Sequence, residues 1–251
     1  MSVFKEEILS AKQIGKRTLR SFLFFLLFIT ACIAGWKWLN RQPQDNGALK
    51  PLRTVLNINE KVFGSLVSDN HLAKTFPVNE AVSKVRVNGN AGMNAGFDPL
   101  TWKLQLIRSP GDTLYISIEE IKALPKTDIV FDFKCIEGWS QVTHWAGVKF
   151  SDFVKHYGLI DQSRMHYAGL STPDKGYYVG IDMKSVLHPQ TILCYEMNGQ
   201  PLPMNQGAPL RLIIPVKYGI KHLKRIGTIF FSDVRPPDYW YERGYDYFSG
   251  L

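Results

Sequence analysis

The 251-residue chain has few cysteines and none of the common catalytic motifs. Its three cysteines stand at positions 32, 135 and 194 without a CxxC pair, which argues against a disulfide scaffold and a structural zinc site. The sequence contains no GxSxG, GxxxxGK[ST], GxGxxG or HExxH segment, so it offers no support for serine-hydrolase, P-loop, dinucleotide-binding or zincin chemistry. The six histidines are scattered without metal-ligand spacing.

Positive charge is concentrated near the N-terminus, and the rest of the chain is almost balanced. The chain has 30 Lys and Arg against 22 Asp and Glu, and residues 1–53 hold nine of the basic and three of the acidic residues. Nucleic-acid binding requires basic residues clustered on the folded part, so we expect no nucleic-acid partner. With 45% hydrophobic and 21% charged residues, the composition is that of a folded protein.

An apolar run over residues 22–39 is long enough to cross a membrane as a helix. It reads FLFFLLFITACIAGWKWL and contains one charge, Lys37, whereas a span needs ~17–25 residues. Basic residues precede the run and Trp36 and Trp38 mark its far end, so the positive-inside rule keeps residues 1–21 cytoplasmic and exports the chain after residue 39. A buried soluble helix is the alternative, but the run is apolar on all faces.

The apolar run over residues 22–39 could be retained as an anchor, cleaved as a signal peptide, or cleaved and lipidated. No A-x-A cleavage site succeeds it, which favours a retained single-pass anchor in the inner membrane over a cleaved signal peptide. Residues 29–32, ITAC, resemble a lipobox in which Cys32 is lipidated after cleavage. Residues 16–20, KRTLR, look like a lysine-substituted twin-arginine export signal.

The exported part is expected to form one β-rich α+β domain over residues 55–251, after a polar linker at 40–54. Short helices are expected to start at Ser117, in a capping box, and at Ser151. Asn198-Gly199 is a hairpin turn signal. Strands are expected over residues 102–107, 128–134, 191–197, 210–214 and 226–231.

Cys135 directly follows one of these strands and precedes a loop rich in Gly and Trp. A thiolate at the mouth of a strand, walled by aromatic rings, can hold a soft metal. Spacing alone favours a buried inert thiol instead. A disulfide between Cys135 and Cys194 is a third possibility in an exported protein.

A second candidate group lies within residues 205–226, where basic residues alternate with apolar ones. Arg211 stands in an apolar run, and a buried guanidinium needs an anionic partner from the protein or from a ligand. Lys217, Lys221 and Lys224 come next, at spacings that can turn two of them toward one phosphate. The alternative is a solvated basic face.

Three segments in the same order resemble the molybdopterin-binding domain of the sulfite oxidase family. They are CIEGWS from residue 135, GAPLRLIIPVKYGIKHLKRI from 207 and PPDYWYERGYDY from 236. The resemblance begins near residue 76, where FPVNEAV and FDPLTWKLQL fit the start of that domain, and continues to the C-terminus. Within the family, the chain is similar to bacterial periplasmic oxidoreductases of the methionine-sulfoxide reductase catalytic-subunit type.

This resemblance implies a molybdenum-molybdopterin (pyranopterin) cofactor and a role for several residues. Cys135 matches the catalytic cysteine whose sulfur ligates the metal beside the pterin dithiolene, and Arg211 and Lys224 match residues that hold the phosphate and pterin groups. Gln206 stands where relatives carry Asn or His, and His222 replaces a small residue. The cofactor contacts implied besides Arg211 and Lys224 are Asn79, Ser171, Thr172, Gln206, Lys221 and His222.

The resemblance also indicates the class of substrate. Sulfite oxidases carry arginines just after the ligating cysteine, whereas Gly138, Trp139 and Ser140 stand there in this chain. With Trp139 and Trp145 expected to wall the entrance, a neutral sulfoxide or N-oxide, small or protein-bound, is favoured over a small dianion.

The resulting interpretation is a membrane-anchored, periplasm-facing oxidoreductase that transfers an oxygen atom. The sequence has no CxxCH haem attachment, so electrons are expected from a haem- or quinone-linked membrane subunit. Two alternatives stay open: a non-catalytic anchored binding domain that retains the fold, and an anchored enzyme acting on another oxyanion such as nitrate.

Overall fold

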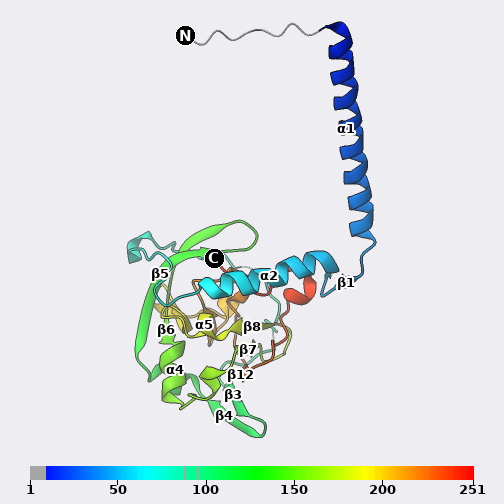
Figure 1. The fold of residues 1–251 in the computed structure, drawn as a ribbon. Coiled ribbons are helices and arrows are strands. Elements are labelled where there is room, and N and C mark those ends of the chain that lie inside the picture. Colours follow the sequence, from blue (N-terminus) through cyan, green and yellow to red (C-terminus); the bar gives the residue numbers. More distant parts are fainter. Residues whose placement is uncertain (1–9, 88, 95) are drawn as a thin grey trace.

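A long helix, α1 (Ala11–Asn40), projects away from a folded domain that contains nearly all of the strands (Figure 1). The computed structural model describes residues 10–87, 89–94 and 96–251, so residues 1–9 of the expected cytoplasmic segment lie outside it. Ser10 begins the helix in a capping box with Gln13. No side chain of α1 is buried, and by length and composition α1 can cross a membrane.

The segment after α1, where a polar linker over residues 40–54 was expected, contains regular secondary structure. It forms a small hairpin, β1 (Gln44–Asp45) and β2 (Ala48–Leu49), and then helix α2 (Lys50–Leu66). The Lys50 backbone N–H donates to the Pro43 carbonyl at 2.9 Å, which closes the hairpin. The polar composition suggested a flexible chain, but these polar residues are ordered by contacts with the domain.

Arg53 of α2 makes the main one of these contacts. Its side chain is 1% exposed and donates to four carbonyl oxygens, those of Asp45, Asn46, Tyr241 and Tyr245. The guanidinium also lies 4.1 Å from the centre of the Tyr241 ring. A buried cation is tolerated here because its N–H groups meet several acceptors at once.

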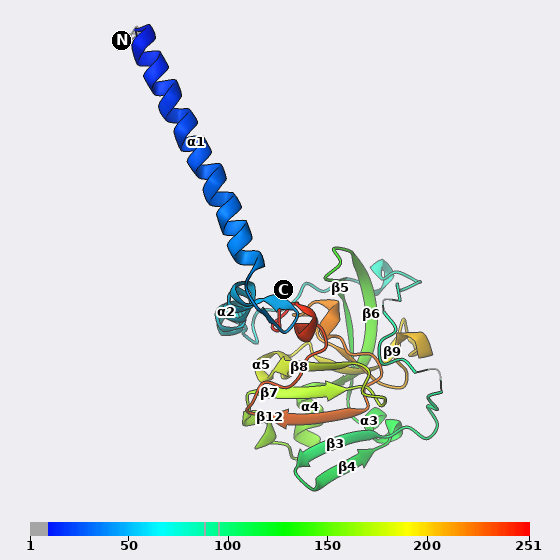
Figure 2. The same ribbon diagram turned by 90° about the vertical axis from the view of Figure 1, so that its right-hand side faces the viewer.

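Two five-stranded sheets form the domain, in agreement with the β-rich α+β prediction (Figure 2). The first is antiparallel, in the order β10-β9-β6-β5 with β11 beside β9. Its strands are β5 (Lys126–Lys134), β6 (Ser140–Lys149), β9 (Ile192–Met197), β10 (Gln200–Pro201) and β11 (Arg211–Ile213).

The second sheet has the order β4-β3-β12-β7-β8, in which only the β3–β12 pair is parallel. Its strands are β3 (Leu104–Ser109), β4 (Asp112–Ile116), β7 (Tyr167–Ser171), β8 (Tyr178–Asp182) and β12 (Thr228–Ser232). The helical elements of the domain are η1 (Val78–Glu80), α3 (Ile118–Lys122), α4 (Phe150–His156), η2 (Gln162–Arg164), α5 (Met183–Val186), η3 (Met204–Gln206), η4 (Gly219–Lys221) and η5 (Tyr241–Arg243).

Most of the core lies where residues of both sheets meet, for example Leu106 of β3, Val148 of β6 and Ile229 of β12. A smaller cluster under the first sheet includes Phe131, Trp145 and Cys194, and the candidate functional site is built on it. Apolar burial of this extent is the main contribution to folding.

The local predictions differ from the structure mainly at element ends. The capping box at Ser117 is confirmed. The next helix begins at Phe150 rather than Ser151, because Lys149 already takes the extended backbone conformation of a cap residue. Strand β3 begins at Leu104, after Trp102, whose indole N–H donates to the Ile226 carbonyl at 2.9 Å.

We expect Arg53→Met to lower the free energy of unfolding of the domain by about 2–4 kcal/mol, because buried carbonyl oxygens lose a charged donor. Urea denaturation in detergent measures this loss. Arg41→Met is the matched control, because Arg41 is exposed near the same hairpin. Equal denaturation midpoints for the two variants would contradict the role given to Arg53.

Candidate functional site

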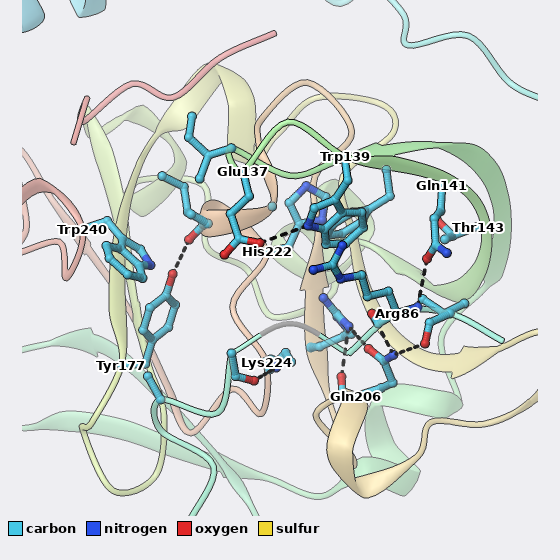
Figure 3. A pocket seen from close by; sticks show the side chains of 18 of the residues that line it. Arg86, Glu137, Trp139, Gln141, Thr143, Tyr177, Gln206, His222, Lys224 and Trp240 are labelled. Atoms are coloured by element: carbon cyan, nitrogen blue, oxygen red, sulfur yellow. Dashed lines mark hydrogen bonds between the residues drawn. The ribbon is translucent and has the colours of Figure 1, made fainter.

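A cavity of about 270 Å³ opens at the end of the β5–β6 hairpin, against η3, η4 and the C-terminal segment (Figure 3). Figure 3 shows Tyr177 and Trp240 on one side of it, Gln206 and Gln141 on the other, and Lys224 between. The lining residues with a part in its chemistry are Arg86, Phe133, Glu137, Trp139, Trp145, Tyr177, Gln206, Arg211, His222, Lys224, Trp240 and Tyr245.

Cys135 is buried directly behind the cavity lining, between lining residues of its own segment. It is 3% exposed, and its chain neighbours Phe133 and Ile136 both line the cavity. A tight turn holds it: the Gly138 N–H donates to the Cys135 carbonyl at 3.0 Å and the Cys135 N–H donates to the Trp139 carbonyl at 2.9 Å. Gly138 has φ +87°, a conformation that favours glycine.

The possible disulfide between Cys135 and Cys194 is not formed; neither described cysteine is bridged. Cys194 lies in β9, and its thiol donates to the Glu196 carbonyl at 3.1 Å. Burial raises the pKa of the Cys194 thiol to about 12, so this cysteine is a protonated, inert core residue.

Arg211 lines the cavity and is almost fully buried. Its side chain is 3% exposed, its Cζ lies 4.5 Å from the centre of the Trp145 ring, and burial lowers its pKa to about 10. Nη1 donates to the backbone and side-chain oxygens of Gln206 at 3.1 and 3.0 Å. Its buried Nε has no hydrogen-bond partner in the described part of the chain, so an anion from outside the chain can complete its bonding.

Lys224 brings a second cation to the same cavity. Its Nζ donates to the Gly89 carbonyl. Burial, together with the positive charge of Arg211, lowers the pKa of Lys224 to about 8, so the ammonium form still predominates at neutral pH. Two cations in one cavity fit an anionic group such as a phosphate.

Lys221, which was expected to contact the cofactor, and Lys217 do not take part in this cation pair. Both are 1% exposed. Lys217 pairs with Asp182 at 2.7 Å, and Lys221 pairs with Asp238 and donates to the Gly180 carbonyl. A carboxylate therefore compensates each buried lysine, and the two pairs fix the η4 region to β8 and to the C-terminal segment.

His222 lines the cavity, but both of its ring nitrogens are occupied. Nε2–H donates to the Lys217 carbonyl at 3.1 Å, and Nδ1 accepts from the Ile214 N–H at 3.4 Å. Burial, and then the nearby Arg211, lowers the His222 pKa to about 3. The His222 ring is therefore neutral at pH 7. Its centroid lies 4.6 Å from the centroid of the Phe133 ring, so the two rings pack together in the cavity wall.

Gln206 acts as a brace between two segments. Its side-chain oxygen receives the bond from Arg211, and its Nε2 donates to the carbonyls of Val85 and Arg86 at 3.3 and 3.4 Å. Relatives were expected to carry Asn or His at this position, where this chain has a glutamine. In the structure it orients the guanidinium while lining the cavity.

Three of the expected contacts lie elsewhere. Asn79 is exposed in η1, and Ser171 ends β7. Thr172 is fully buried, and its Oγ1 donates to Asp174 at 2.6 Å. None of the three lines the cavity, although Thr172 exchanges hydrogen bonds with Tyr177, which does.

The aromatic wall differs from its prediction in one respect. Trp139 stacks on Phe133 with ring centroids 6.1 Å apart, and the Arg86 guanidinium lies 4.7 Å from the centre of the Trp139 ring. Trp139 is half-buried and lines the cavity beside the exposed Glu137. Trp145 is 1% exposed and its indole N–H donates to Thr143 Oγ1 at 2.8 Å. Trp145 therefore forms the floor and not the entrance.

Tyr177 is a lining residue that no sequence pattern indicated. Its hydroxyl donates to the Ile220 carbonyl at 2.6 Å. Burial raises the pKa of Tyr177, and the nearby Asp238 and, less strongly, Cys135 raise it further. The hydroxyl therefore stays protonated. Tyr177 precedes β8 and is far from Cys135 in the sequence, and no motif connects the two.

A family model described as "Oxidoreductase molybdopterin binding domain" matches residues 91–240. A protein of Azospira oryzae named as a protein-methionine-sulfoxide reductase subunit, YedZ1, is 32% identical over 208 residues, which cover 82% of this chain and 78% of that protein. The protein-methionine-sulfoxide reductase catalytic subunit MsrP of Campylobacter jejuni is 30% identical, with 69% of this chain and 63% of that protein covered.

Similarity to other relatives covers less of their length. The catalytic subunit MsrP of Burkholderia mallei is 34% identical over 57% of this chain and 47% of its own. Among solved structures, the sulfane dehydrogenase SoxCD from Paracoccus pantotrophus matches with a TM-score of 0.49 and 16% identity, over 55% of this chain and 40% of that chain.

The cation pair predicts that anion binding depends on pH. Because the Lys224 pKa is about 8, its ammonium is present below pH 8 and is lost as the pH rises through that value, whereas Arg211 stays charged. In protein isolated without cofactor, we expect pyrophosphate affinity to fall by about tenfold or more between pH 7 and pH 9. Isothermal titration calorimetry measures this change.

Lys224→Gln should bind weakly at both pH values, with the pH step removed. Lys103→Gln is the matched control, because Lys103 is exposed and does not line the cavity. A pH step that persists in Lys224→Gln would show that another group is responsible.

Proposed function

Because the chain belongs to the family of oxidoreductase molybdopterin-binding domains, we propose that this molybdopterin-dependent oxidoreductase holds its cofactor in the cavity beside Cys135 and reduces a neutral sulfoxide. One observation carries the proposal: Arg211 and Lys224 line one cavity together with several aromatic rings, and Cys135 is buried next to its lining residue Ile136. Such a site holds an anionic cofactor tail while keeping its reactive part near an uncharged surface.

The donor set fits a metal cofactor that brings most of its own ligands. Within the described ranges, no three His, Cys, Asp or Glu side chains converge to hold a metal ion. Cys135 is a single soft donor, which suits a metal already held by sulfur ligands of a pterin. The Nε of Arg211 supplies the hydrogen-bond donor that a buried phosphate needs.

When bound, the molybdenum centre supplies the two-electron redox chemistry of oxygen-atom transfer. The residues of this chain bind, orient and exclude water. Arg211 and Lys224 hold the phosphate, Gln206 fixes the direction of the guanidinium, and the rings of Trp139, Trp145 and Trp240 reduce the access of water.

The mouth of the cavity favours a neutral substrate. Glu137 lies there and accepts from the Trp139 indole N–H at 3.1 Å, while Arg86 covers the same indole ring. The opposite charges offset one another, so a dianion such as sulfite gains little there. The names of the relatives, which refer to methionine sulfoxide in proteins, support a sulfoxide, including one carried by a protein.

We also propose that α1 anchors the enzyme in the inner membrane, with its catalytic domain in the periplasm. The basic residues before Phe22 and the unburied apolar surface of α1 support this orientation. A haem- or quinone-linked membrane subunit would deliver the electrons. The description of the relatives as subunits supports such a partner.

The non-catalytic alternative is not favoured by the site. Its support was the unusual pair Gln206 and His222, and neither blocks the cavity. Gln206 binds Arg211, and the neutral His222 ring forms part of the wall.

A comparison of substrates tests the proposed reaction. We expect the holoenzyme to reduce methionine sulfoxide with a dye donor faster than it oxidises sulfite with a dye acceptor, because the mouth offers no net positive charge. Steady-state kcat/KM for both reactions gives the answer. Robust sulfite oxidation without sulfoxide reduction would overturn the assignment of substrate.

Replacement of Cys135 tests the metal site. Cys135→Ser removes a soft donor at nearly constant volume, so we expect loss of turnover and a changed molybdenum spectrum with little change in thermal stability. Cys194→Ser is the matched control, since Cys194 is also buried and its hydroxyl replacement can still donate to the Glu196 carbonyl. Wild-type activity in Cys135→Ser would rule out the proposed ligand.

A further inference from the structure

Helix α2 presents its apolar side to the outside of the protein. Residues at spacings of three and four share one face of a helix, and one such face of α2 consists of apolar side chains that are each between 46% and 62% exposed. These residues, here called the α2 apolar face, are Leu52, Val55, Ile58, Val62, Phe63 and Leu66.

The opposite side of α2 binds the domain through polar groups. Arg53 donates to four carbonyl oxygens, and Glu60 accepts from the Tyr167 hydroxyl at 2.8 Å and pairs with Arg235. Asn57 also accepts from Arg235, at 3.3 Å. A surface helix of a soluble domain normally turns its apolar stripe inward, so the arrangement in α2 is reversed.

The position of α2 relative to α1 indicates what the apolar face contacts. The Lys50 N–H is bonded to the Pro43 carbonyl, and Pro43 is three residues beyond the last residue of α1. Three residues reach at most about 11 Å. Trp36 and Trp38 near that end of α1 are 68% and 59% exposed, as expected of residues at a membrane surface.

The ribbon views agree with this position. In Figure 1, α2 runs across the direction of α1, and in Figure 2 it lies beside the lower end of α1 at the edge of the domain. The start of α2 is therefore close to the level at which α1 leaves the bilayer, and its length extends sideways from there.

We propose that α2 is an interfacial helix, which lies in the surface of the same bilayer that α1 crosses and inserts its apolar face among the lipid headgroups and upper acyl chains. This inference rests on the anchoring role proposed for α1. Amphipathic helices that lie in a membrane surface bury such a face about 5–10 Å deep. The polar face, bound to Arg235 and Tyr167, then joins the catalytic domain to the membrane surface.

The adjoining surface extends the apolar contact. A second cavity of about 680 Å³ opens beside the C-terminal half of α2, and its lining includes Phe63, Leu66, Leu72, Phe248 and Leu251. Lipid is favoured over a protein partner or a second copy of the chain because the short connection to α1 keeps the face at the membrane surface whether or not another protein is present.

Nitroxide accessibility in nanodiscs of phosphatidylethanolamine and phosphatidylglycerol tests the proposal on the full-length holoenzyme. In a Cys32→Ser background, labels are placed at Val62→Cys in the apolar face and at Lys61→Cys, an exposed neighbour on another side of α2. Leu27→Cys reports on α1. Cys135 and Cys194 are 3% and 0% exposed, so they are protected from the label.

We expect the label at 62 to collide several-fold less with a water-soluble nickel chelate, and more with oxygen, than the label at 61. Turnover should be retained in both variants, which confirms folding. Equal nickel accessibility at 61 and 62 would overturn the inference. So would protection of 62 that appears only with a membrane subunit, or dipolar broadening between two 62 labels, since these indicate a protein partner or a second copy.

The Leu27 label separates this inference from the proposed anchor. Label 27 in lipid with label 62 in water leaves the anchor intact and overturns the interfacial helix. Label 62 in lipid with label 27 in water overturns the anchor, and with it the inference that α2 lies in the bilayer that α1 crosses. Both labels in water overturn both.

Discussion

A guanidinium group buried without an acidic partner is costly, and the candidate site is organised around Arg211 for that reason. Strand pairing with β9 places Arg211 opposite Cys194, the Trp145 ring supports its flat face, and Gln206 takes two of its bonds. The same chain shows the contrasting solution at Lys217 and Lys221, where carboxylates neutralise the buried charge. The ion pairs of Lys217 and Lys221 stabilise the fold. The Nε of Arg211, which has no hydrogen-bond partner among the described residues, is available to bind an anion.

The sequence predicted the parts of this arrangement that depend on local patterns. Alternation over residues 128–134 predicted β5, and the isolated charge of Arg211 in an apolar run indicated that a buried guanidinium would need an anionic partner from the protein or from a ligand. The role of Lys221 was not predictable, because its partner Asp238 lies 17 residues further along the chain and no spacing rule connects them. Tyr177 was missed for a similar reason: its place in the cavity is decided by how β8 packs.

Helix α2 shows another limit of sequence patterns. Its apolar positions recur at helical spacing, but periodicity does not say which face is covered by the rest of the protein. The contacts of Arg53, Asn57 and Glu60 with the domain decide that. The polar residues of 40–54 likewise suggested a linker because the sequence does not show the Tyr241 and Tyr245 carbonyls that order them.

The closed hairpin between Pro43 and Lys50 also limits how far the catalytic domain can travel. A flexible linker of nine residues would have a root-mean-square end-to-end distance of about 15–18 Å between α1 and α2. The three-residue connection to the closed hairpin is much shorter and acts as a hinge. If α1 lies in a bilayer as proposed, the enzyme would be confined to a thin layer and would meet the proposed membrane electron donor by lateral diffusion, at a high effective concentration. A protein-bound sulfoxide, in contrast, would have to enter this layer from the bulk solution, so its encounter rate would depend on how readily its carrier approaches the membrane surface.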